Sequence, residues 1–144
     1  MIKLKIGIAS DHRGYEVKNK LIDALKKKYE IIDYGTNNTE STDYPVYAFK
    51  LCEDINKIDF GILLCGTGIG ISIAANKVKK IRCARVVSIE DAYLARYHNN
   101  ANVIALSSEQ DIDKLIELIE KFINTEFSNE SRHIRRNEMI DNYD

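Results

Sequence analysis

A cysteine followed by three alternating glycines is the segment of this chain best suited to do chemistry. Cys65 ends an apolar run of strand length, Gly66, Gly68 and Gly70 follow it, and a helix is expected from Ser72. Where a strand is followed by a glycine turn and then by the first turn of a helix, several backbone N–H groups point at one place. The helix dipole adds partial positive charge there. The same field eases the ionisation of a neighbouring thiol. The segment can therefore supply both a base and a cradle for an oxyanion.

Other glycine-rich motifs fit this segment less well. The glycines do not follow the dinucleotide pattern G-x-G-x-x-G, because position 71 is isoleucine, and no Lys-Ser or Lys-Thr stands at P-loop spacing. A cysteinyl phosphatase loop would need an arginine soon after the cysteine, and residues 69–75 contain none. The motif alone leaves one further interpretation open, which is a tight turn with a buried and inert Cys65.

The composition indicates one metal-free domain of the cytoplasm. A chain of 144 residues that is 44% hydrophobic, with a net charge of −1, can bury its own core and gives no electrostatic reason to expect nucleic acid or a membrane as partner. Its apolar runs are too short to cross a bilayer, and it opens with a strand pattern instead of a signal peptide. Cys52, Cys65 and Cys83 are scattered and odd in number, which argues for a reducing compartment and against a disulfide framework or zinc-ligand spacing.

Short apolar strands alternate with amphipathic helices along the chain. Strands are expected at 3–10, 30–34, 60–64, 82–87 and 102–106, and helices at 15–28, 43–55, 72–78, 90–97 and 112–123. Asp43 is expected to cap the second helix, with Pro45 in its first turn. Residues 124–131 resemble a linker, and a basic tail follows. This alternation predicts an α/β fold of parallel βαβ units with helices on both faces of the sheet.

Three polar clusters are expected to meet in one composite site. Asp11 and His12 follow the first strand, Cys65 follows the third, and His98 and Asn99 close the fourth helix just before the fifth strand. Ligands of open parallel sheets bind outside the carboxyl ends of the strands, which is where we place all three clusters. Taken singly, each cluster is also explained as a helix cap or a polar helix end.

Arginines in the basic tail offer a possible phosphate clamp. Arg132 and Arg136 are four residues apart, so on a helix their guanidinium groups would share one face. A solvated basic tail is the plainer interpretation of the same run.

Five blocks of the sequence together carry a more specific pattern. They are Ser10-Asp11-His12, Thr42-Asp43-Tyr44-Pro45, the run CGTGIGISIAANK from Cys65 to Lys77, His98-Asn99 and Arg132-His133. Spread over nearly the whole chain, these blocks resemble the type B ribose-5-phosphate isomerase family, which includes allose- and galactose-phosphate relatives. The resemblance implies a single domain over residues 1–144, built as a Rossmann-like three-layer α/β/α sandwich around a five-stranded parallel sheet. It also implies a homodimer with shared active sites, in some members assembled into tetramers, and a C-terminal tail at 125–144 that reaches the partner subunit.

The resemblance further implies an aldose–ketose isomerisation without metal or cofactor. By this match His98 opens the sugar ring and Cys65 shuttles a proton between C2 and C1 through a cis-enediolate, with the amides of residues 66–70 as oxyanion hole. Thr67 is matched to a relay at the two oxygens, and Asp43 to a further acid. The matched substrate-binding residues are Asp11, His12, Tyr44, Gly66, Gly68, Ile69, Gly70, Asn99, Arg132 and Arg136. Of these, His12 and the two arginines bind phosphate, the arginines coming from the partner subunit.

The expected reaction is interconversion of ribose 5-phosphate and ribulose 5-phosphate, a step of the non-oxidative pentose phosphate pathway. Two alternatives stay open: isomerisation of a hexose 6-phosphate such as allose or galactose 6-phosphate, and a non-catalytic sugar-phosphate binding module. The chain departs from the family at Glu109, where members usually carry an arginine. An active enzyme then needs Glu109 to face solvent or to hold a neighbouring cation, or another cation to reach the phosphate. Arg13 and Arg135 are the candidates, and we favour Arg13 because helix N-termini attract anions.

Overall fold

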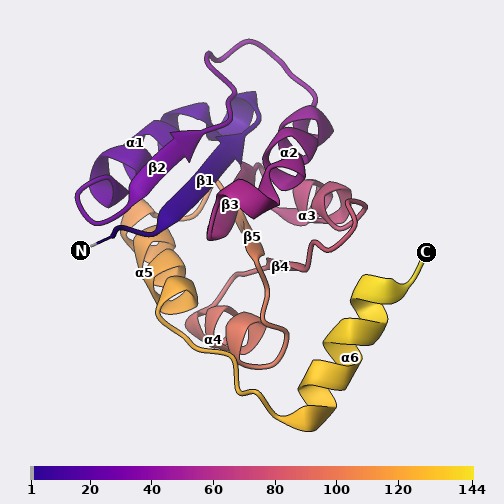
Figure 1. Cartoon of the computed structure of the whole chain (residues 1–144). Coiled ribbons are helices and arrows are strands. Elements are labelled where there is room, and N and C mark those ends of the chain that lie inside the picture. Colours follow the sequence, from indigo (N-terminus) through magenta and orange to yellow (C-terminus); the bar gives the residue numbers. More distant parts are fainter. Residues whose placement is uncertain (1) are drawn as a thin grey trace.

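Five parallel strands form the centre of the computed structural model, which describes residues 2–144 of the chain (Figure 1). They are β1 Lys5–Ser10, β2 Glu30–Asp33, β3 Phe60–Cys65, β4 Cys83–Arg85 and β5 Val103–Ser107. Every neighbouring pair is parallel, and the order across the sheet is β2-β1-β3-β5-β4. The chain therefore winds to opposite sides from the adjacent strands β1 and β3, which creates a switch point where parallel sheets bind ligands.

Six α-helices surround or flank this sheet. They are α1 Tyr15–Leu25, α2 Tyr44–Glu53, α3 Ile69–Ala75, α4 Ile89–Tyr97, α5 Ile112–Ile123 and α6 Ser131–Asn142, with two short 3₁₀ turns, η1 His12–Gly14 and η2 Ile55–Lys57. Helices α2 and α3 pack on one face of the sheet, and α1, α4 and α5 lie on the other. The three-layer α/β/α architecture is confirmed. Among residues 2–144, no helix has the length and apolar character to cross a membrane.

Successive residues of one strand pack into two separate hydrophobic cores, one on each face of the sheet. Ile62 and Leu64 of β3 pack in the core under α1, α4 and α5, whereas Leu63 and Cys65 pack in the core under α2 and α3. This division follows from the strand geometry, because successive side chains point to opposite faces of the sheet. Cys65 is therefore directed toward α3, the helix that begins just beyond it.

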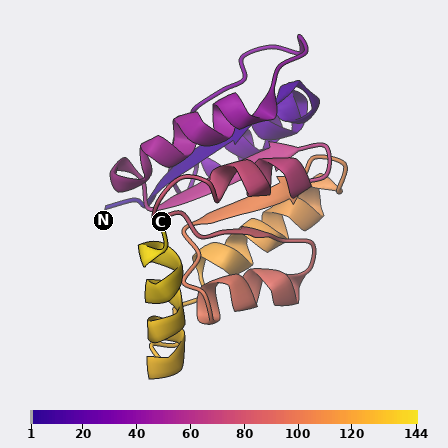
Figure 2. The same cartoon turned by 90° about the vertical axis from the view of Figure 1, so that its right-hand side faces the viewer.

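Three elements differ from the sequence prediction. Helix α3 begins at Ile69 and not at 72, because Gly68 takes a left-handed conformation (φ 81°) and lets the helix start at once. Strand β4 is confined to Cys83–Arg85, where it pairs with β5 alone at the edge of the sheet. The predicted basic tail is an ordered twelve-residue helix, α6, which stands outside the three layers (Figure 2).

A buried lysine, which the sequence patterns did not predict, fixes the segment that leads into the site. Lys18 of α1 is fully buried, and its Nζ lies 2.8 and 2.7 Å from the two carboxylate oxygens of Asp33 at the end of β2. Asp33 Oδ1 also accepts the N–H of Gly35 at 2.9 Å. Because a buried ammonium needs a charged partner, this pair ties α1 to the start of the loop that carries Thr42.

Candidate active site

A cavity of about 460 Å³ lies beyond the carboxyl ends of β1 and β3, at the switch point of the sheet. The residues that line it come from the β1–α1 turn, the start of α2 and the glycine turn after β3. They are Asp11, His12, Arg13, Thr42, Tyr44, Cys65, Gly66, Thr67, Ile69 and Gly70. The structure thus brings most of the predicted site residues together, and with them Arg13, the favoured candidate for a replacement cation, and Thr42.

Cys65 is one of the residues that line this cavity. Its side chain is 5% exposed, and its Sγ accepts the N–H of Gly68 at 3.1 Å. Glycine is required at 68 for two reasons: φ is 81°, and a Cβ there would lie 3.0 Å from the carbonyl carbon of Leu106 in β5. The tight turn therefore holds a backbone dipole against the sulfur and leaves the sulfur facing the cleft.

The glycine turn uses its amides differently from the prediction. We expected the amides of residues 66–70 to form one oxyanion hole, but the Gly68 N–H points at Cys65 and the Ile69 N–H donates to Thr67 Oγ1 at 3.1 Å. The first N–H groups of a helix have no intrahelical acceptor, so the Gly70 amide, in the first turn of α3, stays available for a ligand oxygen. The Thr67 hydroxyl is held beside it.

Tyr44 and Gly70 meet at the side of the cavity. A Cβ on Gly70 would lie 2.5 Å from the Tyr44 hydroxyl oxygen, so glycine at this position lets the hydroxyl enter the cleft. Asp43 is the N-cap residue of α2 as predicted, with Pro45 in the first turn, but its side chain makes no capping hydrogen bond. It is an exposed carboxylate next to Tyr44.

Asp11 and His12 both line the cavity, and both also make hydrogen bonds that hold the surrounding backbone. The Asp11 side chain caps the turn η1 by accepting the N–H groups of Arg13 at 3.0 Å and Gly14 at 3.2 Å, and it is only 5% exposed. His12 Nδ1 accepts the N–H of Thr42 at 3.1 Å, and the His12 N–H donates to Thr42 Oγ1 at 3.2 Å. A neutral His12 ring therefore carries its proton on Nε2, from which it can donate to an anionic ligand.

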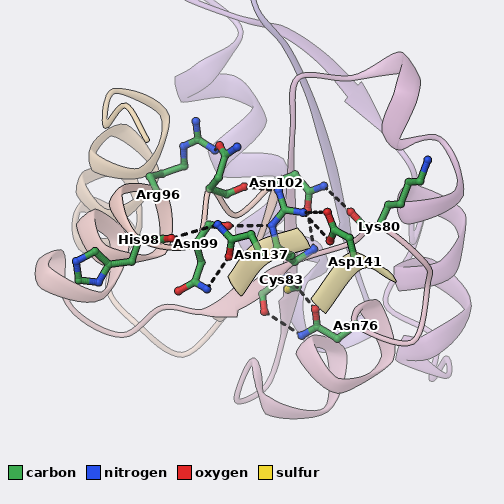
Figure 3. Close-up of polar contacts among 11 residues, drawn as sticks. Asn76, Lys80, Cys83, Arg96, His98, Asn99, Asn102, Asn137 and Asp141 are labelled. Atoms are coloured by element: carbon green, nitrogen blue, oxygen red, sulfur yellow. Dashed lines mark hydrogen bonds and ion pairs between the residues drawn. The ribbon is translucent and has the colours of Figure 1, made fainter. Parts of the chain in front are cut away.

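The predicted residues His98 and Asn99 form a second cluster with α6. The His98 ring stacks on His133, with 4.4 Å between ring centroids and 17° between planes. Asn137 accepts from Asn99 Nδ2 at 3.1 Å and donates to the His98 carbonyl at 3.2 Å (Figure 3). Desolvation, reinforced by the nearby His98, lowers the pKa of His133, so that this ring is neutral at neutral pH.

This second cluster lies at the opposite end of the strands from Cys65. The register pairs Cys65 with Ser107 at the carboxyl end of β5, whereas Asn99 precedes the amino end of the same strand. The five residues of β5, Val103–Ser107, cover about 16 Å. The expectation that all three clusters converge within one chain is wrong, because α4 returns the chain to the amino ends of the strands before β5 begins.

Arg82 joins the second cluster to α6. Its guanidinium binds both carboxylate oxygens of Asp141 at 2.7 and 2.6 Å, and it donates to the carbonyls of Asn99 at 2.9 Å and Asn100 at 3.0 Å. Arg132 and Arg136 are exposed on the same helix. The turn after α4 and the helix that carries the predicted phosphate clamp therefore form one unit.

Sequence reasoning missed Arg82, Asn137 and Asp141. The spacing of His133, Asn137 and Asp141 at i, i+4 and i+8 was a usable signal, because these positions share one face of a helix. That face is the one turned toward the end of α4 and toward Arg82.

The three cysteines are expected to differ sharply in reactivity. Desolvation raises the pKa of Cys52 and of Cys83 to about 12 each, so at pH 8 only roughly 10⁻⁴ of either thiol is ionised. Cys65 is also buried, but it lines the active-site cavity and its sulfur accepts the Gly68 N–H, whereas the half-buried Cys83 lines a separate pocket. Iodoacetamide at pH 8 should modify Cys65 while sparing the other two, as read by peptide mass spectrometry, and modification of the other two should rise only as the pH approaches 12. The chain unfolded in denaturant, where all three react, is the control. Labelling of Cys83 as fast as Cys65 would contradict this assignment.

The fold and the cleft define a class: a three-layer α/β/α domain with a cysteine-based site for a small polar ligand. No group of three or more His, Cys, Asp or Glu side chains within residues 2–144 is arranged to hold a metal ion. Residues 6–140 match the ribose/galactose isomerase family, and the chain belongs to this family.

Named relatives agree with this membership. The chain is 41% identical to a probable ribose-5-phosphate isomerase B of Mycoplasma genitalium, over 99% of this chain and 97% of the relative. It superposes on a ribose 5-phosphate isomerase of Thermotoga maritima with a TM-score of 0.93 at 44% identity, covering 97% and 99% of the two chains. A Mycoplasma genitalium ribose-5-phosphate isomerase B with bound ribulose-5-phosphate gives a TM-score of 0.92 at 40% identity, covering 99% and 97%.

Proposed function

We propose that this chain interconverts ribose 5-phosphate and ribulose 5-phosphate. The relatives named for this activity match it over nearly their whole length, and one of them binds ribulose-5-phosphate. The observation that carries the proposal is the Cys65 thiol in the lining of the cleft, with the Gly68 N–H directed at its sulfur and Thr67 in the same lining. Three free thiols also suit a reducing compartment, and we place the enzyme in the cytoplasm.

The cleft residues fit an enediolate route. The thiolate of Cys65 takes the proton from C2 of the open-chain aldose, and the electron pair left on C2 moves toward the aldehyde, so that negative charge develops on O1. The Gly70 amide and the Thr67 hydroxyl are placed to donate to the oxygens that carry this charge. Return of the proton to C1, with a proton shift from O2 to O1, completes the ketose.

A second copy of the chain would complete the site. Helices α2 and α3 lie side by side and expose apolar residues next to the cleft, with Val46 at 56%, Phe49 at 39%, Ile69 at 48% and Ile73 at 64% exposure. Covering such a surface favours association. We therefore propose a homodimer, with tetramers as a further assembly of the same unit.

In this dimer the second cluster would act in trans. His98 of the partner subunit would open the sugar ring, Asn99 would contact the sugar, and the arginines of α6 would hold the phosphate. The proposal is supported by the placement of these residues at the far end of the strands from Cys65, and by the exposure of Arg132 and Arg136. The segment 125–144 then serves the neighbouring site.

An assay with the purified chain tests the proposed function. We expect ketose formation from ribose 5-phosphate with a kcat/KM at least about tenfold above that for allose 6-phosphate, which carries one more carbon. EDTA should leave the rate unchanged, because a thiolate and hydrogen-bond donors suffice for the proton transfers. A preference for the hexose phosphate would replace the proposed substrate. Thermal stabilisation by ribose 5-phosphate without ketose formation would indicate a binding module.

A further inference from the structure

The side chain of Arg13 lies against the wall of the cleft. Its guanidinium covers the Cα of Gly66, where a Cβ would come within 2.9 Å of the guanidinium carbon. The Arg13 backbone is held by the Asp11 cap at 3.0 Å, so the side chain starts from a fixed point next to His12. Arg13 therefore brings a permanent positive charge to the same cavity as Cys65.

Glu109, two residues beyond the end of β5, holds this guanidinium. Its Oε1 accepts from Arg13 Nη2 at 2.7 Å. The Glu109 N–H donates to Ser107 Oγ at 3.2 Å, and the Ser107 hydroxyl donates to the Gly66 carbonyl at 2.7 Å. The Glu109 backbone is thus linked through Ser107 to the glycine over which Arg13 lies. Of the alternatives considered for Glu109, the structure shows the one in which it holds a neighbouring cation, and the cation is Arg13.

We propose that Arg13 binds the phosphate of the substrate and that Glu109 keeps the guanidinium at the cleft until the phosphate takes it. Exchange between the two anions is physically reasonable, because the paired side chains are 56% and 68% exposed and exposed ion pairs are weak. A phosphate monoester is close to a dianion at neutral pH, whereas Glu109 carries a single charge. The planar guanidinium can also donate two parallel hydrogen bonds to phosphate.

The neighbours of Arg13 supply a second donor for the same anion. His12 directs its Nδ1 to Thr42, which leaves the Nε2 proton for a ligand. Arg13 and His12 are consecutive residues of one turn, so a single phosphate can be held by both. Glu109 then competes for one of the two donors and sets how tightly the anion is held.

Arg13→Ala is expected to raise KM for ribose 5-phosphate by about tenfold or more, the loss typical of one charge-assisted pair. The kcat should stay within about twofold, because phosphate contacts bind ground state and transition state alike. Arg13→Lys should restore part of the affinity, since lysine keeps the positive charge but lacks the two parallel donors of the guanidinium. Glu109→Gln should lower KM about two- to fivefold by removing the competing carboxylate.

A double-mutant cycle separates this role from a general change of surface charge. In an Arg13→Ala background Glu109→Gln should no longer lower KM, because the cation for which Glu109 competes is gone. Lys20→Ala and Glu117→Gln change the charge equally at exposed positions of α1 and α5, and should leave KM unchanged. An unchanged KM in Arg13→Ala, or a Glu109→Gln effect that persists without Arg13, would overturn the proposal.

The proposal uses ribose 5-phosphate only as the substrate of the proposed function, and a second measurement is independent of that choice. Titration calorimetry with inorganic phosphate should show weaker binding in Arg13→Ala and tighter binding in Glu109→Gln. If the native chain shows no turnover of ribose 5-phosphate, the proposed function fails, while these titrations still decide whether Arg13 holds a phosphate. Circular dichroism of each variant should be native-like, which excludes a folding defect as the cause of weaker binding. The tighter binding expected of Glu109→Gln is a change that a folding defect would not produce.

Discussion

Replacing Cys65 by alanine is expected to lower isomerase turnover by about three orders of magnitude, within the range that positioned proton transfer contributes. Substrate binding should be nearly unchanged, because the base acts on the transition state and the polar groups of the cleft remain. Steady-state kinetics with ribose 5-phosphate gives the first quantity, and titration calorimetry gives the second. A loss in kcat without a comparable rise in KM is the signature of a group that acts in the chemical step.

Isotope exchange makes this test specific for proton transfer. The native enzyme should incorporate deuterium from heavy water at the reacting carbons, and the Cys65→Ala chain should not. Cys83→Ala is the matched control, because it removes a thiol that desolvation keeps protonated, with a pKa of about 12, and that does not line the cleft. Near-normal exchange in the Cys65→Ala chain would assign the base to another residue.

Local patterns in the sequence were sufficient to predict the layers of the fold. Alternating strand and helix signals located all five strands, because each strand is a short apolar run and the cores on both faces are filled by successive residues such as Leu63 and Leu64. The start of α3 was missed by three residues, since three alternating glycines lower helix propensity and only the left-handed Gly68 shows where the helix begins.

The candidate site was predictable only where it is local. Asp11, His12 and the glycine turn follow adjacent strands, and the sheet alone brings them together. His98 could not be placed in the same way, because the end of the strands that it reaches depends on the direction of α4. Contacts between positions far apart in the chain, such as Arg82 with Asp141 and Arg13 with Glu109, leave no periodic signal. Such pairs had to come from the structure.

The separation of Cys65 from His98 leads to the second large effect, which is recovery of activity by mixing two inactive chains. A Cys65→Ala chain lacks the proton-transfer base, and a His98→Ala chain lacks the proposed ring-opening residue, so each homodimer should be nearly inactive. In a heterodimer the intact cleft of one chain faces the intact His98 of the other, and one site of the two is complete. Random pairing of equal amounts should therefore restore about a quarter of native activity if the sites act independently.

A second mixture tests independently whether each site is shared between two chains or complete within one chain. When equal amounts of the native chain and a Cys65→Ala/His98→Ala chain are mixed, every heterodimer has one defect in each site. Activity should then be about a quarter of that of an all-native sample with the same total number of chains. If each chain carried a complete site of its own, the same mixture would keep about half. Subunits would be exchanged by reversible dissociation, and native mass spectrometry of chains of different mass would verify that heterodimers form. Heterodimers without recovery in the first mixture, together with half activity in the second, would place His98 in the same site as the Cys65 of its own chain, or outside the site.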